Sequence, residues 1–131
     1  MTKISRLLSL CALTLATFPA TGAEVQLLGS WTATFSGGSK NYIDFTGRVG
    51  DCFTGKMSAT GSQGWSSTFV CPTRSLQKGE STAILKDNEL KITFLDGTFY
   101  DITIDPGGWL NSVYKDPKAN AASPAIFYRN N

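Results

Sequence analysis

Residues 81–104, STAILKDNELKITFLDGTFYDITI, decide the fold because they read as three short strands joined by two tight turns. Leu90, Ile92 and Phe94 alternate with polar residues, which is the two-residue period of a strand with one buried face. The same alternation resumes after the turn at residues 96–97. Because one face of this meander is apolar and the other polar, the apolar face must be covered by a second layer or by closure of the sheet into a barrel.

The register of the meander follows from keeping its apolar side chains on one face. A two-residue loop after the second strand would send the apolar sets of the two strands to opposite faces. A three-residue loop over residues 95–97, with Gly97 left-handed as a bulge, avoids this. It sets Ile92 opposite Tyr100.

The same register gives a favourable pair on the wet face. Lys91 lies opposite Asp101, an arrangement worth at most ~1 kcal/mol. Upstream, a two-residue turn at residues 87–88 sets Leu85 opposite Leu90. All three strands then present one continuous apolar face.

Residues 1–23 are expected to be a signal peptide and not part of the fold. Lys3 and Arg6 give a positive start, residues 7–16 are an apolar run, and small residues close the segment. The run is too short to span a membrane. We therefore expect cleavage, a secreted or periplasmic location, and one β-barrel domain over residues 24–131.

Charge excludes several partner classes. The chain has 12 basic and 10 acidic residues. Loss of Lys3 and Arg6 with the signal peptide makes the two numbers equal, and no basic stripe is present. Nucleic acid and anionic lipid are therefore not expected partners, and no stable membrane insertion is expected after cleavage. The oligomeric state is open.

The two cysteines of the mature chain, Cys52 and Cys71, should form a disulfide in an oxidising compartment. Residues 52–60 and 65–71 read as a hairpin, and residues 61–62 suit a two-residue turn with glycine first. That register sets the cysteines directly opposite each other. The bridge would close a loop of about 20 residues and contribute roughly 3 kcal/mol.

The first strand of the mature chain carries Trp31 and Ala33 on one face. A three-residue loop over residues 37–39 would set Trp31 opposite Phe45 and Ala33 opposite Ile43.

The remaining segments complete a chain of eight or nine short strands without helical periodicity. Residues 46–50 and 116–123 read as loops, residues 72–80 as a polar connection, and residues 109–114 and 125–129 as short strands. Evenly spaced short strands with turn signals are typical of barrels and sandwiches. We expect an all-β fold, a small antiparallel up-and-down β-barrel of about eight strands, with a β-sandwich as the alternative.

Gly29-Ser30-Trp31 at the head of the first strand resembles the G-x-W signature of the calycin group, which includes lipocalins, avidins and bacterial metalloprotease inhibitors. The resemblance implies a lipocalin-like barrel in which the tryptophan closes one end and a basic residue of the last strand lies across its ring. Arg129, near the end of the chain, is placed for that role.

The residue types argue against catalysis. The chain has no histidine, which excludes a histidine base, triad or imidazole metal site, and paired cysteines are neither nucleophiles nor ligands. Asp44, Asp51, Asp101 and Asp105 are candidates for a carboxylate pair, but each is explained as a strand-end or turn residue. Residues 87–89 lack the spacing of a calcium loop. We expect a non-enzymatic protein without a metal or cofactor.

Aromatic residues are the better guide to a site. The expected hairpin register puts Phe53, Met57 and Val70 on one face and Trp65 and Phe69 on the other. If the first face is core, the second stands outside beside the disulfide, where large aromatics mark binding surfaces. The alternative is that a loop or neighbouring strand covers them.

The other aromatics have simpler expectations. Trp31, Phe45 and Tyr100 are expected to fill the barrel or line its lumen. Trp109 follows Pro-Gly-Gly at a loop tip, as a plug or a contact. It joins the two outer aromatics as a candidate ligand- or partner-binding residue.

Three function classes follow. The first is a binding barrel with a small ligand in its lumen or mouth, which a lumen blocked by side chains would exclude. The second is an exported inhibitor of a protease or lysozyme, which a mobile segment at residues 24–28 would favour. The third is a carbohydrate- or surface-binding module that uses Trp65 or Trp109 as a stacking platform beside carboxamides.

Overall fold

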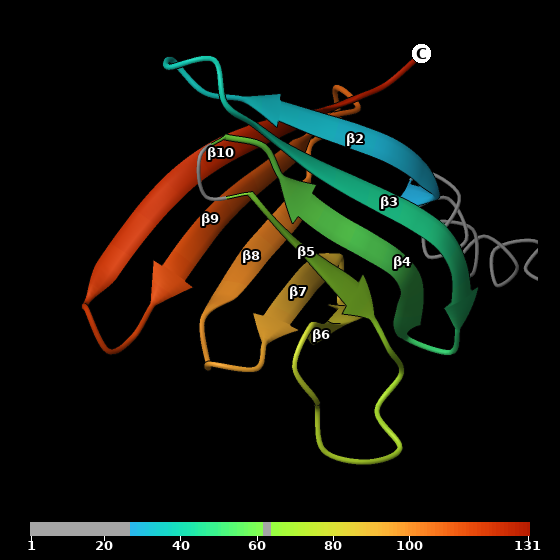
Figure 1. The fold of residues 1–131 in the computed structure, drawn as a ribbon. Helices are drawn as coiled ribbons and strands as arrows, with labels where there is room; N and C mark the ends of the chain where they lie inside the picture. Colours follow the sequence, from blue (N-terminus) through green and yellow to red (C-terminus); the bar gives the residue numbers. More distant parts are fainter. Residues whose placement is uncertain (1–26, 62–63) are drawn as a thin grey trace, which may run out of the picture.

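The computed structural model describes residues 27–61 and 64–131, which form a closed β-barrel (Figure 1). The strands are β2 (Gly29–Thr34), β3 (Lys40–Val49), β4 (Cys52–Ala59), β5 (Trp65–Phe69), β6 (Glu80–Lys86), β7 (Glu89–Phe94), β8 (Phe99–Ile104), β9 (Leu110–Asp116) and β10 (Ala121–Arg129). Their order around the barrel is β10-β2-β3-β4-β5-β6-β7-β8-β9. The expected small all-β barrel is confirmed, and the sandwich alternative is wrong.

The expected signal peptide, which precedes the first strand, lies outside the described residues. No helix within residues 27–61 and 64–131 is long and apolar enough to span a membrane.

The meander of β6, β7 and β8 has the expected register. The pairs are Leu85 with Leu90, Ala83 with Ile92, Ile92 with Tyr100, Leu90 with Ile102, and Lys91 with Asp101. Asp87 and Asn88 both have positive φ, 53° and 66°, which is the backbone of a type I′ hairpin turn. The apolar faces of the three strands therefore meet the barrel interior.

Three hairpins share a three-residue loop that ends in a left-handed glycine. Gly38, Gly97 and Gly108 have φ values of 89°, 91° and 99°, and the N–H of each donates to a carbonyl three residues earlier. In the β2–β3 hairpin this geometry places the loop at residues 36–38, one residue earlier than expected.

The expected pairing of the first hairpin is therefore wrong by two residues. Trp31 lies opposite Ile43 and not Phe45, and Ala33 lies opposite Asn41. Because the shift is an even number, each side chain keeps its face and the buried set is unchanged.

The β4–β5 hairpin differs from expectation by one residue. Ala59 lies opposite Trp65 and Gly55 opposite Phe69, so residues 60–64 form the connection in place of a two-residue turn. A one-residue slip exchanges the faces of a strand. Phe69 accordingly points inward: it is 2 % exposed and stacks on Phe45, with ring centroids 5.8 Å apart. Its expected position on the outside is wrong.

One pair of neighbouring strands is parallel, so the barrel is mixed and not wholly antiparallel. Thr68 of β5 lies beside Glu80 of β6. Residues 70–79 leave the wall after β5 and return to start β6 in the same direction, as the loop at the lower edge of Figure 1 shows.

The Cys52–Cys71 disulfide fastens that connection to the start of β4, which confirms the expected pairing. The two Cα atoms are 5.7 Å apart. The ladder partners of Cys52 are Val49 of β3 and Ile84 of β6 and not Cys71, because β5 ends at Phe69. The bridge thus joins a loop to the wall and does not lie across two paired strands.

Two strands are longer than expected. β3 continues through a bulge between Phe45 and Gly47, and β10 begins at Ala121. The loop expected over residues 46–50 is therefore largely strand, and of residues 116–123 only residues 117–120 form a turn.

The barrel closes where β10 meets β2. The ladder there has two residue pairs, Tyr128 with Thr32 and Arg129 with Trp31. Pro124, farther along β10, has no N–H and cannot donate to a ladder. The strand contact at this seam is short.

Side chains strengthen the seam and seal the adjacent end of the barrel. Trp31 is 1 % exposed, and the guanidinium of Arg129 lies over its ring at 4.2 Å, the contact expected from the sequence. Arg129 Nη1 donates to the Leu28 carbonyl at 2.7 Å, and Trp31 Nε1 to the Leu27 carbonyl at 2.9 Å. A Cβ on Gly29 would lie 2.8 Å from Arg129 Nη1, so this glycine leaves room for the guanidinium.

Large side chains fill the barrel from this closed end to its middle. Those at or below 1 % exposure include Leu27, Trp31, Ile43, Phe53, Met57, Ile92, Ile102, Leu110 and Phe127. Buried hydroxyls find partners, since Ser67 and Ser81 are 2.8 Å apart and Ser112 donates to the Ala125 carbonyl at 2.8 Å. The described side chains therefore pack this half of the barrel and do not line a large lumen.

Substitutions at the closed end should distinguish the stability that the packing of Trp31 contributes from the stability that the Arg129 ring contact contributes. Trp31→Ala should lower the free energy of unfolding by about 3–5 kcal/mol, because it leaves a cavity in the sealed end. Arg129→Ala should cost less, about 1–2 kcal/mol, through loss of the ring contact and a hydrogen bond. Urea titration measures both. Equal costs would contradict a role of Trp31 as the main plug.

Reduction of the Cys52–Cys71 bridge should lower the free energy of unfolding by roughly 3 kcal/mol, since the bridge restricts a loop of about 20 residues in the unfolded chain. The native oxidised protein should also resist alkylation. Free thiols in protein purified from an exported pool would contradict this expectation.

Candidate ligand-binding site at the open end of the barrel

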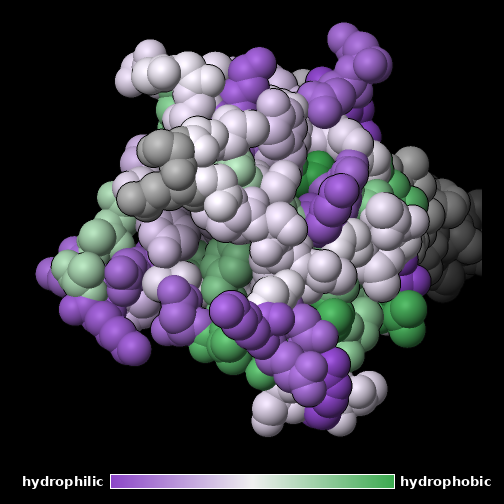
Figure 2. Space-filling view, viewed as in Figure 1, coloured by the Kyte–Doolittle hydropathy of each residue, from purple (hydrophilic) through white to green (hydrophobic). Residues whose placement is uncertain are grey.

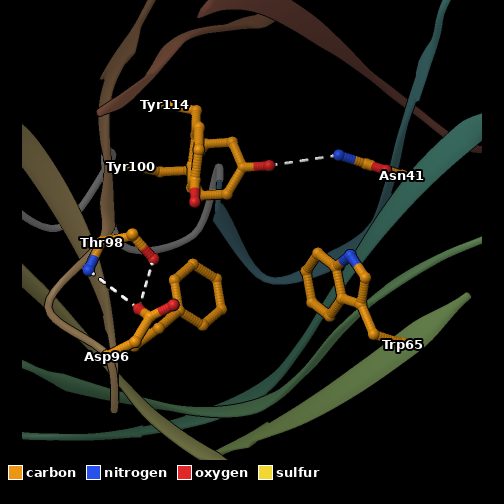
Figure 3. Close-up of a pocket in the computed structure, with 7 residues that line it drawn as sticks. Asn41, Trp65, Asp96, Thr98, Tyr100 and Tyr114 are labelled. Carbon is orange, nitrogen blue, oxygen red and sulfur yellow. Dashed lines mark hydrogen bonds between the residues drawn. The ribbon is translucent and has the colours of Figure 1, made fainter. Parts of the chain in front are cut away.

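The two ends of the barrel are different. One is sealed by Trp31 and Arg129. The other, at the left of Figure 1, is where β2–β3, β4–β5, β7–β8 and β9–β10 connect, and it contains a cavity of about 440 Å³. The cavity is lined by Asn41, Trp65, Phe94, Asp96, Thr98, Tyr100 and Tyr114 (Figure 3).

Strand alternation brings these residues together. Phe94 continues the inward series of β7, and Tyr114 continues that of β9 after Leu110 and Ser112. Each lies near the terminus of its strand at the open end. The interior is therefore packed below these two residues, which stand at the mouth of the barrel.

Four aromatic rings form an arc along the wall of the cavity, and we call them the aromatic arc: Trp65, Phe94, Tyr100 and Tyr114. The Trp65 and Phe94 rings are 5.6 Å apart at 83°, Phe94 and Tyr100 are 5.9 Å apart at 69°, and Tyr100 and Tyr114 are 5.0 Å apart. Edge-to-face contacts of this kind stabilise the rings against each other. The arc is consequently preformed.

Asn41 supplies a polar group from the side of the cavity that faces Tyr100. Its Nδ2 donates to the Tyr100 hydroxyl oxygen at 3.2 Å (Figure 3). Burial and the nearby Tyr114 raise the pKa of Tyr100 to about 12, although the Asn41 hydrogen bond lowers it. Tyr100 is therefore a neutral phenol at physiological pH.

Asp96 supplies a carboxylate at the rim. Its Oδ1 accepts hydrogen bonds from the Thr98 hydroxyl at 2.6 Å and the Thr98 N–H at 2.9 Å. These bonds lower the pKa of Asp96, so the carboxylate is ionised at neutral pH. Among the cavity-lining residues it carries the only formal charge.

The chemistry of the lining suits binding. Within residues 27–61 and 64–131, no three His, Cys, Asp or Glu side chains gather as a metal site requires. The four carboxylates considered for catalysis are outside this cavity and have polar partners: Asp44 with Ser30, Asp51 with Arg48, Asp101 with Lys115, and Asp105 with Asn111. Aromatic walls with a few polar groups are typical of small-molecule sites.

The structure places the three candidate binding residues in three environments. Trp65 is 39 % exposed and lines the cavity. Phe69 lies in the core. Trp109 is on the outer surface near the closed end, where its Nε1 donates to Asn111 at 3.2 Å and its ring lies 6.3 Å from that of Tyr128.

Several residues of the site were not expected from the sequence. Asn41 and Tyr114 share the inward face with Ile43 and Ser112, so alternation alone identifies them as inward. Asp96 was expected only as a turn residue. The alternation of the sequence does not predict which end of the barrel is open.

On the side of the molecule shown in Figure 2, the hydrophobic groups are small and separated by hydrophilic ones. Compared with models of protein families, with curated proteins and with solved structures, the chain shows no significant match.

Burial of Tyr100 should make stability depend on alkaline pH. The pKa is about 12 in the folded protein and 10 for an ordinary tyrosine, so the unfolded state loses its proton first. The contribution is fully present below pH 10 and is lost as pH rises to about 12, a decrease of about 3 kcal/mol. Tyr100→Phe should remove this component in urea titrations at several pH values. An unchanged alkaline profile in that variant would contradict the assignment.

Proposed function

We propose that this chain is an exported, non-enzymatic binding protein that holds a small ligand in the open end of its barrel. The observation that carries the proposal is the asymmetry of the barrel: one end is sealed, and the other has an aromatic-lined cavity of about 440 Å³. This volume is within the usual range of about 300–1,000 Å³ for small-molecule sites.

The filled interior favours a ligand at the mouth. Phe53, Met57 and Phe127 occupy the middle of the barrel and are fully buried. Phe94 and Tyr100, which would have argued against a ligand had they blocked the lumen, instead line the cavity. The ligand would rest on this floor and extend toward solvent past Trp65.

Two observations support the exported and calycin-like parts of the proposal. The Cys52–Cys71 disulfide is expected in an oxidising, extracytoplasmic compartment. Gly29, Trp31 and Arg129 occupy the positions that the calycin resemblance implies. The nine strands and the parallel β5–β6 pair set this barrel apart from a simple up-and-down barrel.

A carbohydrate is the second candidate ligand, because the same cavity combines Trp65 with the carboxamide of Asn41. Trp109 is a weaker stacking platform, since its ring lies against Gly107 and beside Tyr128. The inhibitor alternative gains no support from the described start of the fold, where Leu27 is buried under Trp31.

Titration with N-phenyl-1-naphthylamine, a neutral aromatic dye, tests the site. We expect saturable, one-to-one binding with energy transfer from tryptophan to the dye. Trp65→Ala and Tyr114→Ala should weaken binding at least about tenfold, because each removes one aromatic wall. Trp109→Ala is the matched control and should leave the affinity unchanged.

Near-UV circular dichroism and the melting temperature establish that the variants are folded. Equal weakening by Trp65→Ala and Trp109→Ala, or binding without saturation, would contradict a site at the open end.

A further inference from the structure

The charge of the cavity lining is negative. Asp96 is ionised, and the other six lining residues are neutral. Its Oδ1 accepts two hydrogen bonds from Thr98. A carboxylate has about four acceptor sites, so Asp96 has acceptor capacity left for a ligand.

The aromatic arc also favours a positively charged ligand. The faces of indole, phenol and phenyl rings carry a negative quadrupole, and a cation within about 6 Å of a ring centroid is attracted to it. Trp65 has the ring with the strongest such attraction and is the most exposed hydrophobic residue of the arc. Figure 3 shows it across the cavity from Tyr100 and Tyr114.

Lys118, on the β9–β10 connection, is a cation in the neighbourhood of Asp96. The Lys118 ammonium contributes to the lowered pKa of Asp96. It makes no ion pair with Asp96 within 4 Å among the described residues, and it does not line the cavity. The cavity itself thus has a carboxylate and four π faces but no cationic side chain.

We infer that the ligand of this cavity is a small organic cation, an ammonium group on an apolar or aromatic body, with its charge between Asp96 and the aromatic arc. The inference rests on the proposed binding function and adds the chemical class of the ligand. The apolar body fills the rest of the cavity against Phe94 and Tyr114.

Displacement of the neutral dye by benzylamine, benzyl alcohol and benzoate tests the inference. The three probes share one ring and carry a charge of +1, 0 and −1 at pH 7. Benzylamine should compete about tenfold better than benzyl alcohol, and benzoate should compete least. Choline and its neutral isostere 3,3-dimethylbutan-1-ol give an independent pair.

Two substitutions of opposite charge provide a signature that general damage to the fold does not. Asp96→Asn keeps an acceptor for Thr98 and should weaken benzylamine about three- to fivefold, because an exposed carboxylate contributes modestly. Lys118→Gln should strengthen benzylamine by a smaller factor. Both should leave benzyl alcohol unchanged.

Asp116→Asn is the matched control. Its Oδ1 also accepts hydrogen bonds from loop N–H groups, those of Lys118 and Ala119, at the same end of the barrel. It is outside the cavity lining, so this variant should keep the preference for benzylamine.

The outcomes separate the inference from the proposed function. Dye binding with equal competition by the three probes, or with preference for benzoate, overturns the cationic ligand and leaves the site standing. Absence of dye binding contradicts the site itself. Tighter binding of Nα-acetyl-lysine N-methylamide than of benzylamine supports the cationic class and moves its source to a side chain of a partner protein.

Discussion

The structure depends on the closure of β10 onto β2, which is made by very few contacts. Only two residue pairs form that ladder, and the Asn130 N–H adds one bond to the Ser30 carbonyl. An open sheet of this size would expose two edges able to pair with other chains. Arg129 compensates for the short ladder because it joins the last strand to the ring of Trp31 and to the chain entering β2. The contact between the Arg129 guanidinium and the Trp31 ring therefore strengthens a seam that has few backbone hydrogen bonds.

Closure of the barrel also creates the candidate site, because the residues of the site come from strands that are far apart in the sequence. Asn41, Trp65 and Tyr100 come from three strands separated along the chain and meet only when the sheet curves onto itself. Trp31 and Arg129 fill one end of the barrel, and the aromatic-lined cavity lies at the other. The site is thus a consequence of an asymmetric filling of the barrel: bulky aliphatic and aromatic groups at the bottom, aromatic rings with polar edges at the top.

Local chemistry made much of the fold predictable. The left-handed glycine at Gly97 and the Asp87-Asn88 turn each specify one register through a few adjacent residues, and the meander follows. The β4–β5 connection is longer than the two-residue turn that its sequence suggests, and the parallel β5–β6 pair depends on residues 70–79, which carry no periodic signal. Trp65 was identified as a candidate but assigned to the wrong face, since a one-residue slip exchanges faces.

Stabilising contacts and the candidate site occupy different parts of the barrel. The Trp31–Arg129 contact closes one end, and the disulfide starts at Cys52, where β4 leaves that same end. The cavity leaves Trp65 39 % exposed, which forgoes part of the stabilisation that its burial would contribute. A domain of about a hundred residues has a free energy of unfolding of only about 5–15 kcal/mol. The exposed aromatic rings at the open end are tolerated because the Trp31–Arg129 contact and the disulfide stabilise the barrel elsewhere. We therefore expect substitutions at the open end to change binding without opening the barrel.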